Sequence, residues 1–493
     1  MKKKSIMYCI LALIWIVGWI ASAPYAMLDD ALIHLRYASF LHTLHHITYD
    51  GIHYSYGTSS LLYVFLLSLL RGISLSPVLP RVVSIISYIL LLVLLLRLRS
   101  RFRSGTTPRF LWLGLLLTTL APMAIRWLTD GMETSIVLIG IVALAIMTVQ
   151  LQKDQTPSRI LLSCALLLGA ALVLTRIELL MPLFLSACAI AAIRLEKSTK
   201  PASLATIFAS CSMLLGGAGA FIGIRIVFGH WLPDTALAKS GSFSFSPLFG
   251  FAHVTASAFI FGIGAALLTL LSAVLVVRAI LRGNHAIGRL VAWLVINSCL
   301  PVELLLACIR DQAVQGIRYI VWAFYFAILW NVLELAAILE ELPTEAAPRP
   351  IHRAVWATCG VLFLCLLPFD TRYSLRAMRG RSETFLQMRS AGLEKYKNVT
   401  VIAGDVGFIG YFTGAQVCDI DGLVNGRERA TLTLAQRLQF CANDNPGLLF
   451  LTAPQLEGIA PFLALKQWRS VMIVDFRNVS SNDRHYLMLP VMP

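Results

Sequence analysis

The chain has 493 residues, of which 58% are hydrophobic and 14% are charged, and its mean hydropathy is +0.75. Soluble domains carry about 25% charged residues, so this composition excludes an ordinary soluble protein. A net charge of +15 would suggest a nucleic-acid partner in a soluble chain. Here lysine and arginine gather in short loops between apolar runs, which favours a membrane protein with a basic inner face and no nucleic-acid partner.

Apolar runs of membrane-spanning length begin near the N-terminus and recur along most of the chain. Ile6–Ile20, Val82–Leu96 and Phe110–Ile125 are examples, and runs of about 20 residues match the hydrocarbon thickness of a bilayer. The basic start, Met1–Lys4, favours an uncleaved first helix whose N-terminus lies in the cytoplasm. The strongest later marker of the inner face is Arg97–Arg109.

A shorter apolar stretch, Thr58–Leu70, precedes the second predicted span at Leu79–Leu96. With about thirteen residues it is too short to cross a bilayer, so we expect it to lie in the outer interface. An amphipathic surface helix is also predicted over Ala31–His46. If Thr58–Leu70 does not span, the later basic loops all fall on the cytoplasmic side. The sequence then predicts a polytopic α-helical membrane protein of about eleven transmembrane helices, the last at about Ala354–Pro368.

Residues 370–493 have ordinary polarity, and we expect them to form a small α/β domain on the outer face, beyond a membrane module at residues 1–369. Alternating strands and helices indicate this class. For Cys418 and Cys441, a disulfide and two free thiols are both open. The predicted strands are Asn398–Gly404, Gln416–Ile420, Gly447–Leu451 and Ser470–Asp475, and the predicted helices are Ser382–Lys397 and Thr431–Ala442.

Two adjacent aspartates, Asp29 and Asp30, follow the first apolar run directly. They could cap the next helix, provide a general base for a hydroxyl group, or hold a divalent cation through oxygen ligands. Charges beside membrane spans are costly and therefore mark candidate functional sites. The other charged or titratable residues assigned to the outer face are His34, Arg36, Asp50, Arg126, Asp130, Glu133, Arg176, Glu178, Arg225, Asp234, Lys239, Arg310, Asp311 and Arg318.

Several short segments resemble, in the same order, motifs of membrane glycosyltransferases with the GT-C fold. The nearest group is the cell-wall arabinofuranosyltransferases, which use a decaprenyl-phosphate sugar. Leu28–Ala38 (LDDALIHLRYA) is similar to the opening of their first outer loop. Tyr54-Ser55 and Ile177 depart from the family pattern, so donor specificity does not carry over. The other similar segments are Asp50–Ser59, Asp130–Thr134 (DGMET), Thr175–Glu178 (TRIE), Gly229–Lys239 (GHWLPDTALAK), Gly316–Tyr319 (GIRY) and Gly404–Leu423.

The resemblance implies inverting transfer of a sugar from a polyprenyl-phosphate carrier at the outer face of the cytoplasmic (inner) membrane. The acceptor would be an envelope glycan, lipid or protein. Asp29 is the expected catalytic base, and Asp30 orients it or takes its place. Arginine and lysine would stabilise the leaving phosphate. The expected substrate-binding residues are Arg36, Tyr56, Arg126, Glu133, Arg176, Glu178, Lys239 and Arg318.

Each of these roles has a structural alternative. Arg176 could instead form an ion pair with Glu178 or Glu133, and Glu133 could cap the helix that it begins. Asp405, Asp419 and Asp421 could shape an acceptor cleft or end strands in turns. No phosphate cradle for a nucleotide sugar is evident, and the need for a divalent cation stays open.

Two other functions compete with a transferase. A transporter or flippase of a lipid-linked saccharide should show inverted repeats and charged or broken helices at the membrane midplane. The sequence contains no such repeat, and most charges lie at one face. A non-catalytic envelope scaffold is the third hypothesis, against which the Asp29-Asp30 pair argues.

Overall fold

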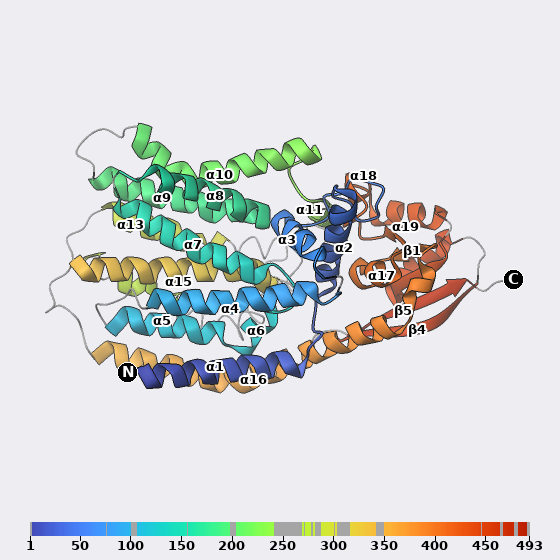
Figure 1. Ribbon diagram of the computed structural model, residues 1–493, viewed down its shortest axis with the longest axis horizontal. Coiled ribbons are helices and arrows are strands. Elements are labelled where there is room, and N and C mark those ends of the chain that lie inside the picture. Colours follow the sequence, from blue (N-terminus) through green and yellow to red (C-terminus); the bar gives the residue numbers. More distant parts are fainter. Residues whose placement is uncertain are drawn as a thin grey trace.

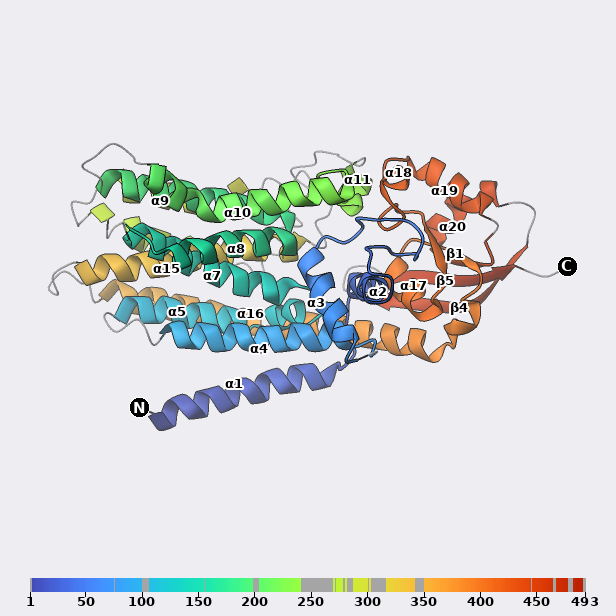
Figure 2. The same cartoon turned by 45° about the horizontal axis from the view of Figure 1, so that its top comes forward.

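A computed structural model of the chain describes residues 2–74, 76–99, 106–154, 156–197, 204–240, 269–270, 272–277, 280–281, 287–299, 301–302, 316–341, 350–444, 446–463, 467–477 and 482–490. The molecule is elongated, with a bundle of long helices at one end and a mixed β-sheet at the other (Figure 1). Two short helices, α2 and α3, lie between these parts in both views (Figures 1 and 2). The N-terminus is at the bundle end and the C-terminus at the sheet end.

The bundle is formed by apolar helices that run along the long axis of the molecule (Figure 1). Among the described residues, five helices are long and apolar enough to cross a membrane. The predicted count of eleven stays a prediction, and the span expected between residues 249 and 278 lies largely outside the described ranges. The bundle helices are α1 (Lys2–Ser22), α4 (Leu79–Arg99), α5 (Thr106–Thr119), α7 (Thr134–Lys153), α8 (Arg159–Thr175), α9 (Leu180–Lys197), α10 (Leu204–Phe228), α13 (Ile287–Asn297), α15 (Gly316–Glu341) and α16 (Pro350–Ser390).

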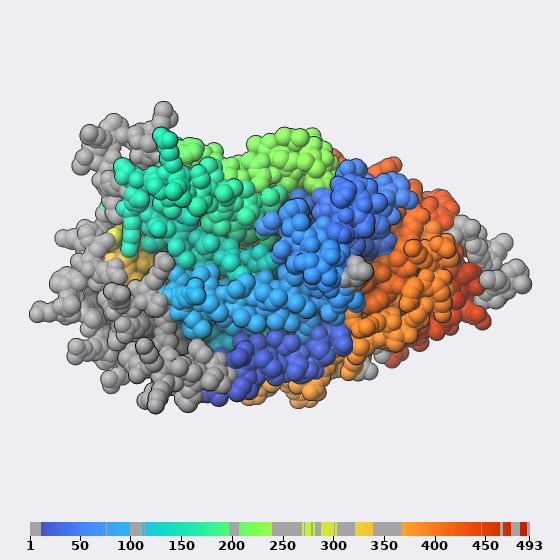
Figure 3. All heavy atoms as spheres, in the orientation of Figure 1, coloured from blue at the N-terminus to red at the C-terminus, as the bar shows by residue number. Residues whose placement is uncertain are grey.

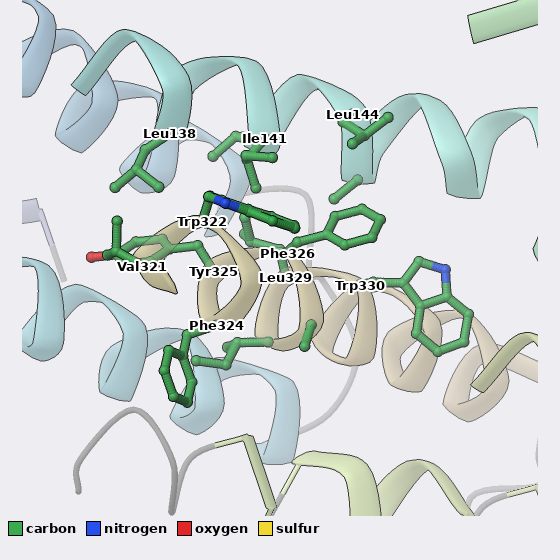
Figure 4. Close-up of a cluster of buried hydrophobic side chains, with 14 of the residues drawn as sticks. Leu138, Ile141, Leu144, Val321, Trp322, Phe324, Tyr325, Phe326, Leu329 and Trp330 are labelled. Carbon is green, nitrogen blue, oxygen red and sulfur yellow. The ribbon is translucent and has the colours of Figure 1, made fainter. Parts of the chain in front are cut away.

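The centre of the bundle is packed by aromatic side chains of α15. Trp322, Phe326 and Trp330 are fully buried, and Figure 4 shows residues of α15 against Leu138 and Ile141 of α7. Large apolar side chains on the outer surfaces of other helices stay exposed, as the lipid-facing side of a membrane bundle requires.

Helices α8 and α10 approach closely because glycine faces the partner backbone. A Cβ on Gly169 would lie 1.8 Å from the carbonyl oxygen of Met213, and one on Gly216 would lie 1.9 Å from that of Leu166. Small residues allow such contact, which replaces the hydrophobic driving force that is missing within lipid. These two glycines therefore determine how α8 and α10 pack.

The apolar run Phe110–Ile125 is not one helix. Helix α5 ends at Thr119, and the short helix α6 (Pro122–Leu128) begins at Pro122. Proline lacks an amide hydrogen and fits the first helical position, so it starts a new helix rather than continuing the old one. All residues of α6 are buried, so this short helix is packed inside the protein.

Two short helices lie where the interfacial helices were expected. Helix α2 (Asp29–Leu44) begins two residues before the predicted start, and α3 (Leu61–Arg71) occupies most of the predicted short stretch. Helix α3 buries Tyr63 and Leu67 but exposes Phe65 and Leu69. An exposed apolar face on a helix too short to span is consistent with a position at the membrane surface.

The C-terminal region contains a five-stranded sheet of order β2-β1-β3-β5-β4. Strands β2, β1 and β3 are parallel, whereas β5 pairs antiparallel with both β3 and β4. The first four strands lie where the sequence predicted them, but β5 was not predicted. The strands are β1 (Thr400–Ala403), β2 (Gln416–Asp419), β3 (Leu448–Thr452), β4 (Trp468–Arg477) and β5 (Asn482–Pro490).

The helices of this region differ in part from the prediction. The expected helix at Ser382–Lys397 is the outer part of α16, which continues to Ser390 and contains Pro368 in its interior. Helix α19 (Leu434–Asn443) matches its prediction, whereas α17 (Val406–Thr413) was missed. Its short glycine-containing sequence lacks a helical signal in isolation.

The structure contains a disulfide between Cys418 and Cys441, the pairing that the sequence left open. It joins β2 to α19. Asp419, next to Cys418, accepts hydrogen bonds from the amides of Asp421 and Val424, at 2.8 and 3.0 Å. Asp419 therefore ends β2 in a turn, which was the structural alternative to a role in an acceptor cleft.

Candidate active site

Helix α2 lies at the junction of the bundle and the sheet region (Figure 2), and it contacts α3, α4 and α17. The start of α2 is fixed by a backbone hydrogen bond, in which the amide of Leu28 donates to the carbonyl oxygen of Asp130 at 3.1 Å. Ala31, Leu32 and Leu35 are fully buried. The helix is therefore a fixed platform for the charged residues along it.

Asp29 contacts the N-terminus of α17, a helix almost four hundred residues away in sequence. Its two carboxylate oxygens accept hydrogen bonds from the amides of Gly407 at 2.8 Å and Phe408 at 2.6 Å. Of the readings left open for Asp29, capping of α2 is not what the structure contains: Leu28 occupies the N-cap position, with no side-chain cap, and Asp29 accepts from the first amides of α17.

The surroundings of Asp29 favour a carboxyl group that takes up a proton readily. Burial raises its pKa well above the ordinary value, and the nearby charge of Asp405 raises it further. The two amide hydrogen bonds act in the opposite direction but do not cancel these effects. A carboxylate has about four lone pairs, so each oxygen can still accept a proton from a hydroxyl group.

Asp30 is the next residue of α2 and is partly buried in the first helical turn. A carboxylate there interacts favourably with the helix dipole of α2. Its negative charge also raises the pKa of Asp29. The two aspartates thus influence each other, as a base and its neighbour would.

A second cluster of charges is buried where α7, α8 and α2 meet. Nη1 of Arg176 lies 3.1 Å from Oε1 of Glu133, and its Nε donates to Oε1 of Glu178 at 2.6 Å. Nε2 of His34 lies 3.5 Å from the other Glu133 oxygen, and Nδ1 of His34 lies 2.8 Å from the Thr58 hydroxyl.

This second cluster contains the ion pairs that were the structural alternative for Arg176. Glu133 is at the N-cap position of α7 but makes no side-chain capping bond. Since Arg176 and Glu133 are almost fully buried, each needs the other as a partner. The pair joins the N-terminal end of α7 to the C-terminal end of α8.

Arg36, a predicted substrate-binding residue, instead ties α2 to the sheet region. Its guanidinium donates to the backbone carbonyl oxygens of Tyr49 at 2.7 Å, Ala415 at 2.6 Å and Gly410. The same group lies 4.5 Å from the centre of the Tyr49 ring. All three of its nitrogens are thus engaged with the protein, which is a structural role.

Tyr56 joins the segment between α2 and α3 to the segment after α10. The amide of Tyr56 donates to Oδ2 of Asp234 at 2.9 Å, and the amide of Asp234 donates to the carbonyl oxygen of Tyr56 at 2.8 Å. The Tyr56 ring stacks on Phe228, with centroids 4.5 Å apart. This arrangement places α11 (Asp234–Ser240), and with it the backbone of Lys239, beside the loop.

The remaining predicted cations are placed in different ways. Arg126 is buried in α6 against the rings of Trp127 and of Tyr373 of α16, at 4.8 and 5.3 Å. Lys239 and Arg318 belong to α11 and α15, but their side chains lie outside the described part of the structure.

Within the described ranges, no three His, Cys, Asp or Glu side chains gather closely enough to hold a metal ion. The Asp29 carboxylate accepts from two backbone amides, and the charges of Asp405 and Asp30 also act on it.

Sequence reasoning missed the partners of Asp29. The amides of Gly407 and Phe408 have no side-chain signature, so only the Gly404-Asp405-Val406-Gly407 motif indicated that this segment matters. It also missed the pair formed by His485 of β5 and Asp405, whose Nε2 and Oδ2 lie 2.7 Å apart.

No family model matches the sequence, and a search of curated proteins found no match. The fold does match solved structures. ArnT from Cupriavidus metallidurans bound to undecaprenyl phosphate aligns with a TM-score of 0.56 and 12% identity, over 99% of this chain and 98% of that chain. The apo form of the same protein aligns over the same shares with a TM-score of 0.58 and 11% identity.

At this level of identity the likeness establishes the fold alone. Together with the long apolar helices, it shows that the chain is a multi-pass helical membrane protein with an ArnT-like GT-C fold. The alignment extends over nearly the whole chain, so the sheet region is included in the shared architecture.

Proposed function

We propose that this protein is an inverting glycosyltransferase that moves a sugar from a polyprenyl-phosphate carrier to a hydroxyl group of an envelope glycan, lipid or protein. The observation that carries the proposal is the Asp29 carboxylate at the junction of the bundle and the sheet region, in a fold shared with a protein crystallised with undecaprenyl phosphate. The motif resemblance to arabinofuranosyltransferases agrees with this class without defining the sugar.

In the proposed reaction, Asp29 takes the proton of the acceptor hydroxyl. The oxygen then attacks the anomeric carbon from the face opposite the carrier. The bond between that carbon and the phosphate oxygen breaks, and the polyprenyl phosphate leaves with the electron pair. A raised pKa makes the Asp29 carboxylate a stronger base than an exposed aspartate.

The leaving phosphate needs positive charge near the membrane surface. Because Arg176 and Arg126 are engaged with protein groups, we assign this role to Lys239 and Arg318, the other two cations that the motif resemblance gives as candidates. Asp30 would orient Asp29 or take its place as the base. The Glu133–Arg176–Glu178 cluster would position the outer ends of α7 and α8.

The proposed topology puts the N-terminus in the cytoplasm and residues 370–493 on the outer face. The Cys418–Cys441 disulfide supports this orientation, because disulfides persist in oxidising compartments outside the cytoplasm. The donor would therefore be a lipid-linked sugar, since nucleotide sugars belong to the cytoplasm.

The test is sugar release or transfer by the purified full-length protein from a panel of polyprenyl-phosphate sugars. Asp29→Asn should lower turnover about 10²- to 10⁴-fold, the usual contribution of a general base. Glu457→Gln, the same change on the exposed surface of α20 (Ala453–Ile459), should retain wild-type turnover.

Equal turnover in wild type and Asp29→Asn would remove Asp29 from the base role and make Asp30→Asn the next variant. Absence of turnover across the panel, together with movement of a lipid-linked saccharide across proteoliposomes, would replace the transferase with a flippase.

A further inference from the structure

A cavity of about 520 Å³ lies between the membrane-surface helices and the outer region, away from the two charge clusters described above. It is bordered by α2, by the residues on either side of the α3–α4 loop, by the end of α16 and by α17. Figure 3 shows the face on which the blue segment near residue 70 meets the orange outer part of α16. A volume in this range suits a small ligand or a lipid headgroup.

The lining of this cavity is positively charged. It includes Arg36, Arg71 and Arg389, against a single carboxylate from Glu394. Among the described residues, the Arg71 guanidinium makes two long hydrogen bonds, at 3.4 Å to the carbonyl of Ser74 and 3.3 Å to the Tyr411 hydroxyl.

Arg71 and Arg389 can both donate to a ligand. Arginine has five N–H donors, so Arg71 keeps donors for a ligand beyond its two protein contacts. Arg389 is exposed in the last turn of α16. Guanidinium groups bind phosphate through paired N–H donors, so two arginines at one cavity favour a phosphate ligand.

Most of the rest of the lining is apolar, although Ser39 and Tyr411 also border the cavity. Phe40, Pro77 and Phe412 form part of its wall, and Pro77 comes just before α4, which is long and apolar enough to span. Next to Arg71, Ile73 is 84% exposed. With the exposed Phe65 and Leu69 of α3, it forms an apolar strip that ends at the cavity.

We propose that this cavity binds the headgroup of an anionic glycerophospholipid, with the phosphate between Arg71 and Arg389. The acyl chains would lie along the apolar strip of α3. A zwitterionic headgroup would bring an ammonium group toward the excess of arginine and would bind more weakly. Along α2, Arg36 lies seven residues from Asp29, a rise of about 10 Å, so the lipid would occupy a site separate from the proposed base.

The binding site does not depend on the proposed transferase activity. It would fasten the end of α16 and α17 to the membrane surface, because the lipid would contact both as well as the α3–α4 loop. The membrane composition would then influence how firmly the outer region is held against the bundle.

The test uses native mass spectrometry of the full-length protein with added dioleoyl phosphatidylglycerol, dioleoyl phosphatidylcholine or glycerol 1-phosphate. We expect phosphatidylglycerol to bind at least about fivefold more tightly than phosphatidylcholine, and glycerol 1-phosphate to bind weakly. Arg71→Gln and Arg389→Gln should each weaken phosphatidylglycerol binding about fivefold, the usual effect of one basic residue at a membrane surface. Glu394→Gln should strengthen it.

Arg379→Gln is the matched control, because Arg379 is exposed on α16 but does not line the cavity. Its lipid binding should equal that of wild type. Equal affinity for the two lipids in wild type, or equal losses in Arg379→Gln and Arg389→Gln, would overturn the proposal. Binding of glycerol 1-phosphate as tight as that of the lipid would also overturn it, in favour of a soluble anion. Unchanged thermal unfolding in lipid-free detergent shows that the variants are folded.

Discussion

Arg36 provides the sharpest test of how the bundle is joined to the sheet region. We consider Arg36→Leu, which keeps much of the apolar volume and removes the guanidinium. The change removes the side-chain donor from the carbonyl oxygens of Tyr49 and Ala415, whereas the carbonyl oxygen of Gly410 keeps the amide of Gly414 at 3.1 Å as a donor. Each buried acceptor left unpaired costs about 1–3 kcal/mol, and the lost contact with the Tyr49 ring adds about 0.5–1 kcal/mol.

The summed effect should be a local loss of about 3–6 kcal/mol at the contact between α2 and α17, because some carbonyls will find water. Two of the three carbonyls belong to α17 or the turn after it. We therefore expect α17 to open more often while the bundle stays intact. At 3 kcal/mol, amide protection in α17 should fall about 100-fold.

Hydrogen–deuterium exchange of the full-length protein in detergent measures this directly, with peptides from α17 compared with peptides from α7. Turnover should fall as well, because α17 supplies both amides that hold Asp29. The apparent affinity for the donor should change little. Arg379→Leu, on the exposed surface of α16, is the control and should leave exchange in α17 unchanged.

Wild-type exchange in α17 together with a much weaker donor affinity would refute this reasoning. That result would return the Arg36 guanidinium to the substrate-binding role that the sequence suggested.

Three further predictions follow from the outer region. In Gly407→Ala, the added Cβ would lie 2.0 Å from the Asp29 carbonyl oxygen, so the start of α17 must move away from Asp29. Turnover should therefore fall about 100-fold, with donor binding retained. Replacing Cys418 and Cys441 together by serine removes a cross-link over 23 residues and should lower unfolding stability of the outer region by about 3 kcal/mol, as urea denaturation would show. Burial and the neighbouring carboxylate raise the pKa of Asp419 from 3.8 to about 7. The folded chain then holds a proton that the unfolded chain releases, so stability should fall as the pH rises from 3.8 to about 7 and change little above it.

Each of these predictions has a control in the same chain. Gly219→Ala adds a Cβ that meets nothing within 4 Å and should keep wild-type turnover. Cys164→Ser changes an exposed free thiol and should not alter urea stability. Asp419→Asn should flatten the pH dependence, and the same slope in wild type and Asp419→Asn would contradict its assignment to Asp419.

The sequence alone predicted the elements whose patterns are local. Long apolar runs indicated the bundle helices, and the short length of Thr58–Leu70 indicated a helix that does not span. Strands β1 to β4 followed from short apolar segments bounded by turn residues. These features depend on neighbours a few residues apart, which is the range over which hydropathy and turn chemistry act.

Roles that depend on distant partners were predicted less well. Arg36 was expected to bind substrate because a charge beside a membrane is costly. In the structure its guanidinium instead donates hydrogen bonds to three backbone carbonyl oxygens. The same argument selected Arg176, whose two carboxylate partners were named only as an alternative. Charge indicates that a residue needs a partner, but it does not say whether the partner is a ligand or the protein.

From the sequence by itself came the class of protein, the helices of the membrane bundle and the Asp29-Asp30 pair at the start of α2. Only the tertiary structure decided what Asp29 contacts, because the amides of Gly407 and Phe408 are backbone groups that every sequence has. Whether such amides are free depends on where a helix begins, and whether a carboxylate reaches them depends on how two distant segments pack. Both are decided by the fold as a whole.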